Sequence, residues 1–219
     1  MFLSTLRHLH RCEIFDKFAQ PLISKPMSLE FELQKYPKEV KLKDAAKSKF
    51  RPLRKDDEKA FHEFFLAVPE PERMFIKHRV TELPVIQDWC KNIDLGRNLP
   101  LLALMGNKIV GVATLHQQLG GWKRHIGRVS VLVHPNYRGR GLARALVSDI
   151  LSIARFLGLE KVEAEFIGEQ DAAMKMFALM GFSSLMRIEN YVKDMQAITH
   201  DYVLMGLDLK TDEEYAGMG

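Results

Sequence analysis

Glycines and arginines alternate over residues 138–141, in the sequence Arg-Gly-Arg-Gly. An apolar run ends just before this segment at Val133, and apolar residues at helical spacing follow it from Leu142. Glycine allows a sharp turn and a close approach of the backbone to a ligand. The first amide groups of a helix have no partner inside the helix, and its dipole adds positive charge there. With the fork-shaped donors of two arginines, the segment is suited to bind an anion, and a phosphate group above all.

Two common phosphate-binding patterns do not fit this segment. The pattern G-x-x-x-x-G-K-[ST] is absent from the chain, and the dinucleotide pattern G-x-G-x-x-G fails at its third glycine, where Arg144 stands. The spacing therefore argues against a nucleotide hydrolase and against a Rossmann fold. The alternative without a ligand is a glycine-rich turn whose arginines are solvated.

The elements around this segment must hold it between a strand and a helix. Periodicity and turn residues predict a polar hairpin over 40–54, a helix over 56–68 capped by Asp56 or Asp57, a helical patch after Pro71, and a helix from Pro84 that Gly96 stops. The later segments read as strands at 99–105, 108–117 and 123–133, a helix at 142–157, a strand at 161–167, a helix at 171–180, and strands at 182–192 and 200–209. This order predicts an α/β (α+β) fold, with a mixed sheet and helices on its faces.

Composition limits the class of protein. The 219 residues carry a net charge of +4, which suits an anionic small ligand and falls short of the basic stripe of a nucleic-acid binder. Charges interrupt the apolar stretches, so we expect no membrane span. Two cysteines, Cys12 and Cys90, cannot form a disulfide framework, which favours a reducing, cytoplasmic location. We expect no metal, nucleic acid or membrane as partner, and leave a homodimer open.

The chain divides into three parts. Residues 1–35 are expected to form an extension, helical or disordered, because Pro21 and Pro26 separate it from the regular pattern that follows. Its lack of acids before Glu13 also fits a targeting peptide. Residues 36–210 are expected to form one domain, and 211–219 a tail.

Two motifs carry a resemblance to a known family. Arg138-x-x-Gly141-x-Ala143, after an apolar strand, matches the acyl-CoA signature Q/R-x-x-G-x-G/A of GNAT-type N-acetyltransferases, and Phe177-x-x-x-Gly181-Phe182 has the spacing of the family's Y-x-x-x-G-F. The segments YPKEVKLKD, FRPLRKDDE and YVKD…HDYVLM resemble more narrowly the bacterial branch related to protein lysine acetyltransferases and to domains fused to acyl-CoA synthetases. The resemblance implies the GNAT fold, a mostly antiparallel mixed sheet with helices on both faces, and acetyl-CoA as cofactor.

The resemblance also implies where the coenzyme lies. In the family, the amides of this loop hold the pyrophosphate, and the preceding strand splays so that its amides bind the thioester carbonyl and the pantetheine arm. An amide around Leu132 is expected to stabilise the oxyanion. The implied coenzyme-binding residues are Val131, Leu132, Val133, Arg138, Gly139, Arg140, Gly141, Leu142, Ala143, Gln170 and Phe177.

The sequence departs from the family at two catalytic positions. Arg128 stands where a glutamate base is common, and Phe177 stands where a tyrosine acid is common. We therefore consider two substitutes, Glu165, which shares a strand face with Glu163, and His116, at the end of a strand. The alternatives are a solvent-facing acid and a surface or packing histidine, and His125 and His200 are no better candidates.

These observations predict an N-acetyltransferase that moves an acetyl group from acetyl-CoA to a primary amine, of a protein lysine or a small molecule, by direct attack on the thioester. The departures at Arg128 and Phe177 keep open a non-catalytic acyl-CoA-binding sensor. A nucleic-acid-binding module is the weakest alternative, because no pattern of stacking aromatics accompanies the charge.

Overall fold

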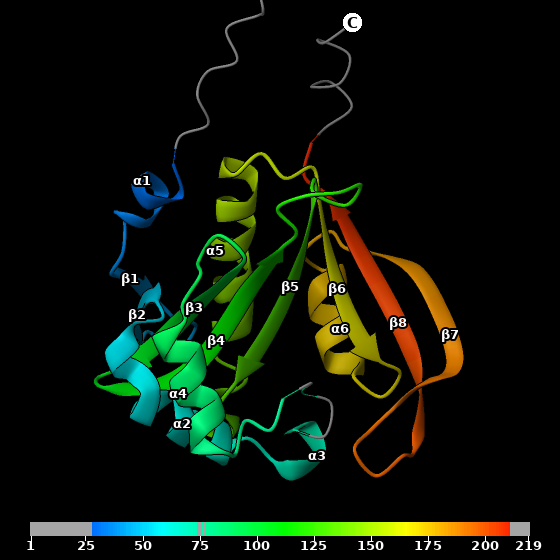
Figure 1. Cartoon of the computed structure of the whole chain (residues 1–219), viewed down its shortest axis with the longest axis horizontal. Coiled ribbons are helices and arrows are strands. Elements are labelled where there is room, and N and C mark those ends of the chain that lie inside the picture. The colour runs from blue at the N-terminus through cyan, green and yellow to red at the C-terminus, as the bar shows by residue number, and fades with distance from the viewer. Residues whose placement is uncertain (1–27, 74–75, 77, 211–219) are drawn as a thin grey trace, which may run out of the picture.

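The structure is a computed structural model, and it describes residues 28–73, 76 and 78–210. Its centre is one sheet of eight strands in the order β1-β2-β3-β4-β5-β6-β8-β7, in which only β5 and β6 run parallel (Figure 1). The strands are β1 (Lys38–Lys41), β2 (Lys47–Pro52), β3 (Asn98–Met105), β4 (Lys108–Gln117), β5 (Ile126–Val133), β6 (Lys161–Ile167), β7 (Ser183–Lys193) and β8 (Thr199–Asp208).

Six α-helices accompany the sheet in the described ranges. They are α1 (Leu29–Leu33), α2 (Glu58–Ala67), α3 (Glu70–Arg73), α4 (Leu83–Lys91), α5 (Leu142–Phe156) and α6 (Asp171–Ala178), with short 3-10 turns at 55–57 and 135–137. Within the same ranges, none of the helices has the length and apolar character needed to cross a membrane. The mixed eight-stranded sheet and its accompanying helices confirm the predicted mixed α/β fold.

Local signals placed most of these elements correctly. Asp57 stands at the N-cap position of α2, but its side chain does not cap that helix. Its carboxylate instead accepts the Arg54 amide at 2.8 Å, which closes the preceding 3-10 turn, and it pairs with Arg51 at 2.6 Å. The strand expected from residue 123 begins only at Ile126, because the preceding residues form turns. The helix expected to reach Gly96 ends already at Lys91.

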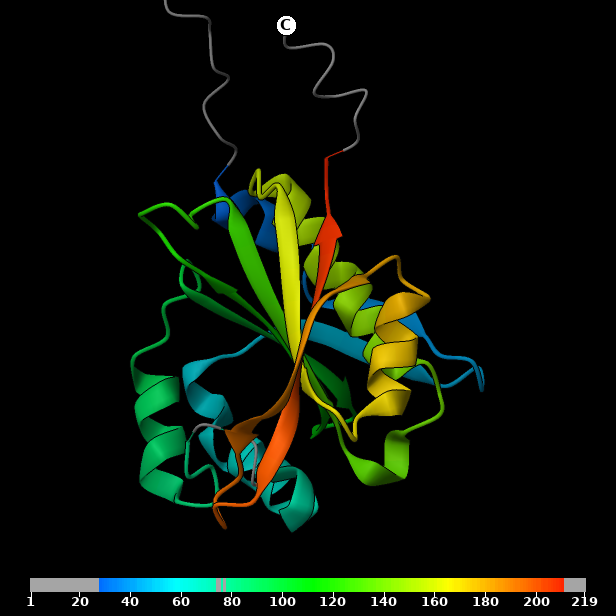
Figure 2. The same ribbon diagram turned by 90° about the vertical axis from the view of Figure 1, so that its right-hand side faces the viewer.

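Helices cover both faces of the sheet (Figure 2), and a hydrophobic cluster packs on each face. Residues of α5 and α6 bury one face, which includes Leu146, Ile150 and Phe177. Residues of α2 and α4 bury part of the other, which includes Phe64 and Ile86. We call this second side the α2/α4 face. Each strand therefore presents alternate residues to the two sides.

The described start of the chain packs onto the main domain. Leu29 and Leu33 of α1 lie against the α5 cluster, although we assigned them to the extension. Asp149 of α5 accepts a hydrogen bond from the Tyr36 hydroxyl at 3.1 Å and pairs with Lys38 at 2.7 Å. The boundary at residue 35 stays a prediction, and the rest of the extension, with Cys12, and the tail at 211–219 lie outside the described residues.

Candidate active site

The parallel strands β5 and β6 separate along their length. In the described chain they pair only over residues 126–128 and 161–163, although β5 continues to Val133 and β6 to Ile167. Figure 1 shows the two strands diverging toward the end of the molecule where α3 lies. One edge of β5 therefore faces a gap instead of a neighbouring strand.

The register decides which amides of β5 face this gap. The His134 amide donates to the Val110 carbonyl of β4 at 2.9 Å, so the alternation of an antiparallel ladder directs the Leu132 amide to β4 as well. The amides of Val131 and Val133 then point the other way, into the gap. We expected an amide around Leu132 to meet the oxyanion; the Leu132 amide is directed to β4, and the amides that face the gap are those of Val131 and Val133.

The loop after β5 has the backbone that its glycines predict. Gly139 and Gly141 have φ angles of 76° and 83°, in the left-handed region that side chains with a Cβ rarely adopt. Gly141 is the N-cap of the 15-residue helix α5 and offers no side chain to cap it. The first amides of α5, including those of Leu142 and Ala143, therefore stay open for an anion.

Both arginines of the loop make contacts within the protein. Arg138 donates to the Val133 carbonyl at 3.2 Å and to the Glu72 carboxylate of α3 at 2.6 Å. Arg140 pairs with Asp44 in the β1–β2 turn at 3.2 Å and lies over the Tyr137 ring. These contacts brace the loop from both sides, so the arginines lie at its rim and the open amides form its centre.

Two of the predicted coenzyme contacts have another role. Phe177 is 1% exposed and packs edge-on against Phe166 and Phe182, so it belongs to the core and is not available to a ligand. We correct its assignment: without a hydroxyl, the ring gains most by full burial. Gln170 closes the β6–α6 turn, since its side-chain oxygen accepts the Ile167 amide at 3.1 Å.

A histidine, a serine and an asparagine form a chain of hydrogen bonds on the α2/α4 face. His116 of β4 lies with Nδ1 2.7 Å from the Asn98 side-chain oxygen of β3 and with Nε2 3.2 Å from the Ser130 hydroxyl of β5. That oxygen can only accept, so Nδ1 carries the proton and Nε2 is the acceptor. This is the arrangement of a general base that a third group orients.

Glu165 reaches the same face but is held by its neighbours. Its carboxylate pairs with Arg128 at 2.9 Å, and Glu163 pairs with Lys123 at 3.8 Å. Burial raises the pKa of Tyr202 on β8 to about 12, and the charge of Glu165 and a hydrogen bond to it act in the same direction. Of the two predicted catalytic residues, His116 is therefore the better placed for proton transfer.

Sequence reasoning missed Asn98, Ser130 and Tyr202. The β4–β5 register pairs His116 with Arg128 and Thr114 with Ser130. Together with the alternation within the strand at 123–133, it would have placed Ser130 diagonally across from His116 on the same face. No such signal exists for Tyr202, because β8 lies between β6 and β7 and the chain order does not reveal this.

The β7–β8 turn is tied to the end of β6 through His200. Its ring nitrogens lie 2.9 Å from the Glu169 carboxylate and 3.2 Å from the Asp194 carboxylate. These two bonds, first that to Glu169 and then that to Asp194, raise the pKa of His200. Burial alone would raise the pKa of Asp194, but the bonds from His200 and from two backbone amides of the turn outweigh it and lower the pKa.

This tie predicts a pH-dependent stability. The folded-state pKa of His200 lies above its ordinary value of 6.5, so its contribution is complete below that pH and is lost as pH rises through the folded value. We expect the difference in free energy of unfolding between the wild type and His200→Gln to be largest at about pH 5–6.5 and to shrink toward about pH 9. Urea denaturation across this range measures it. His125→Gln is the control and should show no such trend, and a pH-independent difference for His200→Gln contradicts the prediction.

The mixed sheet, the gap between β5 and β6 and the open start of α5 define the class of protein as an acyl-CoA-dependent transferase. Comparison with known proteins identifies the family: residues 52–182 match the Acetyltransferase (GNAT) family. The chain belongs to this family. It is accordingly an N-acetyltransferase, and acetyl-CoA is the cofactor of the family.

Individual relatives are distant. The chain is 30% identical to the acetyltransferase SG1711 of Sodalis glossinidius over 119 residues, which are 54% of this chain and 70% of that protein. It is 32% identical to the L-amino acid N-acyltransferase MnaT of Escherichia coli over 77 residues, 33% of this chain and only 45% of that protein. The structure of yncA, a putative acetyltransferase from Salmonella typhimurium with its cofactor acetyl-CoA, superposes with a TM-score of 0.64 at 20% identity, covering 76% and 96% of the two chains.

Proposed function

We propose that this protein transfers an acetyl group from acetyl-CoA to a primary amine, of a small molecule or of a protein lysine, by direct attack of the amine on the thioester. One observation carries the proposal. The edge of β5 that faces the gap carries the amides of Val131 and Val133. Ser130 of the same strand lies 3.2 Å from His116 Nε2, on the face from which an amine can approach.

The residues at the gap fit the coenzyme. A Cβ built at Gly139 meets nothing within 4 Å, so the space beside this turn is open to a ligand. The open amides of α5 suit the pyrophosphate, and those of Val131 and Val133 suit the arm and the carbonyl oxygen. When bound, acetyl-CoA supplies an acetyl group activated as a thioester.

His116 would take the proton of the attacking amine. Asn98 holds the proton on Nδ1, so Nε2 is the atom that accepts a proton. The proton reaches Nε2 either directly from the amine or by way of the Ser130 hydroxyl, which lies 3.2 Å away. Tyr202 keeps its own proton at neutral pH, since its pKa is about 12, and faces the same side of the sheet. We assign it to protonate the leaving thiolate, the role that Phe177 cannot fill. In this proposal Glu165 positions Tyr202 and Arg128 and is not the base.

A cytoplasmic location is part of the proposal, and the homodimer stays an open alternative. Cys90 is a buried free thiol, which suits a reducing compartment.

The test is an assay of the full chain with acetyl-CoA and a panel of primary amines, which follows release of free thiol and identifies the acetylated product by mass spectrometry. We expect thiol release that depends on the amine and matches the product formed. Reactions without amine control for hydrolysis. Tight binding of acetyl-CoA without turnover of any amine contradicts the proposal and favours the acyl-CoA sensor.

A further inference from the structure

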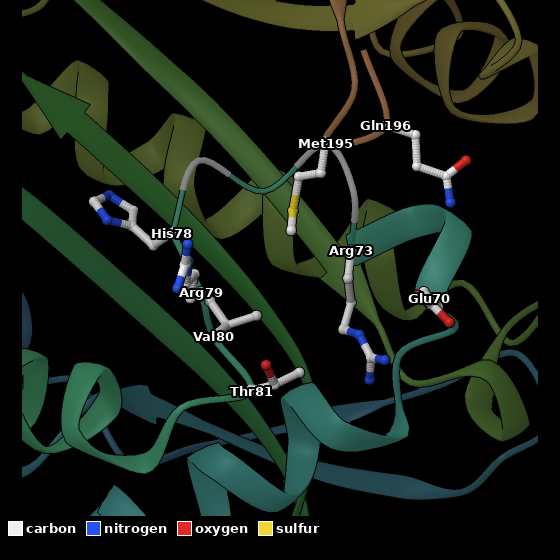
Figure 3. A pocket seen from close by; sticks show the side chains of 8 residues that line it. All are labelled: Glu70, Arg73, His78, Arg79, Val80, Thr81, Met195 and Gln196. Carbon is white, nitrogen blue, oxygen red and sulfur yellow. The ribbon is translucent and has the colours of Figure 1, made fainter. Parts of the chain in front are cut away.

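A pocket of about 350 Å³ lies between α3, the segment 78–81 and the β7–β8 turn. Figure 3 shows Arg73 and Glu70 on α3, with Met195 and Gln196 of the turn across from the segment that carries Arg79. The lining residues are Glu70, Arg73, His78, Arg79, Val80, Thr81, Met195 and Gln196.

Two ties hold the pocket at the mouth of the gap. The Glu72 carboxylate of α3 bonds Arg138, which also donates to the carbonyl of Val133, the last residue of β5. The β7–β8 turn is bound through His200 to Glu169, which lies two residues beyond the end of β6. The walls of the pocket are thus fixed to the ends of the two strands that separate. A molecule in this pocket lies beside the opening through which an acceptor must reach the thioester.

The charges of the lining favour an anion. Arg73 donates through Nη1 to the carbonyls of Phe65 and Leu66 at 3.5 and 3.2 Å, which orients the guanidinium and leaves Nε and Nη2 without a bond among the described residues. Arg79 pairs with Glu82 at 3.3 Å in a contact whose side chains are 77% and 52% exposed, so the pair is weak. Against two guanidinium groups the lining offers one carboxylate, that of Glu70.

We propose that this pocket binds the carboxylate of a small primary-amine acceptor through Arg73 and Arg79, so that the acceptors are amino acids or similar amino-carboxylates. The inference rests on the proposed function. A guanidinium matches a carboxylate with two parallel hydrogen bonds. The volume is at the small end of ligand pockets and suits a single small molecule. Met195, whose side chain is exposed, adds apolar surface, which favours an apolar side chain on the acceptor.

The test compares L-leucine with L-leucinamide as acceptors for the full chain. Both are primary amines of the same shape, and the amine of the amide is the less basic. Intrinsic reactivity therefore favours the amide, and a preference for the acid must come from the protein. We expect kcat/KM to be at least about tenfold higher for leucine, as one charge-assisted hydrogen bond supplies.

Arg79→Gln should raise KM for leucine about 10- to 100-fold and leave KM for leucinamide within about twofold. The reason is that the lost charged contact is made with the carboxylate of the acceptor, which leucinamide lacks. Arg73→Gln should do the same, but it also removes bonds to the end of α2, so Arg79→Gln carries the test if that variant does not fold. Arg155→Gln, at the far end of α5, is the matched control and should match the wild type with both acceptors.

Three results overturn the inference. The first is equal kcat/KM for leucinamide and leucine, and the second is an equal loss with both acceptors in Arg79→Gln. The third is a higher kcat/KM for a lysine peptide without carboxylate side chains than for either of them. In each of these cases amines are still acetylated, and the proposed function stands. Wild-type protein that acetylates no amine at all overturns the proposed function together with the inference.

Discussion

Gly141→Val binds acetyl-CoA about 100-fold more weakly than the wild type, or worse, in a protein that still folds. Gly141 has a φ of 83°, which a β-branched residue avoids, so valine forces the loop onto another path. A Cβ there also lies 3.2 Å from the Lys43 side chain, which must shift slightly to make room. The open amides of α5 then no longer converge, and losing two charge-assisted hydrogen bonds accounts for the effect.

Calorimetric titration with acetyl-CoA measures this affinity. The control is Gly158→Val, at the other end of the same helix. Gly158 has a φ of 75° and nothing within 4 Å of an added Cβ, so the backbone strain is comparable while the coenzyme loop is untouched. Gly158→Val should bind acetyl-CoA like the wild type. Wild-type affinity in folded Gly141→Val would refute the assignment of the loop.

His116→Ala lowers kcat for a lysine acceptor by about 10²- to 10⁴-fold, the usual contribution of a general base. At pH 7 it costs on the order of 4 to 5 kcal/mol to deprotonate a lysine amine, but only about 1 kcal/mol for the α-amine of a peptide. The loss should therefore be smaller for the α-amine. Affinity for acetyl-CoA should stay unchanged, because His116 lies on β4 and β5 stands between that strand and the gap.

Steady-state kinetics with both acceptors check this prediction, and added imidazole should restore part of the activity of His116→Ala. His125→Ala serves as the control, since its side chain makes no hydrogen bond within the described chain. Asn98→Ala should show a smaller loss than His116→Ala, because it only releases the ring from its orientation. Equal loss with both amines and no rescue would remove His116 from proton transfer.

Predictions that rest on contiguous residues agree with the structure. The turn at Gly139 and Gly141, the start of α5 and the hairpin at Gly106 depend on local backbone angles and on amides a few residues apart. Predictions of side-chain roles fared less well. Phe177 matched a family position by spacing, yet its ring is buried between Phe166 and Phe182, and spacing alone does not report burial.

Periodicity and glycine conformations, which a short stretch of sequence encodes, were enough to predict the mixed fold and the strand–turn–helix loop, and the resemblance of two motifs pointed to the family. Only the tertiary structure decided which side chains meet. Asn98, His116 and Ser130 come together through the register of three strands, and Tyr202 reaches the same face because β8 inserts between β6 and β7. Strand order and register arise from pairings between distant segments, and the energy of each pairing depends on both segments, so neither segment alone predicts it.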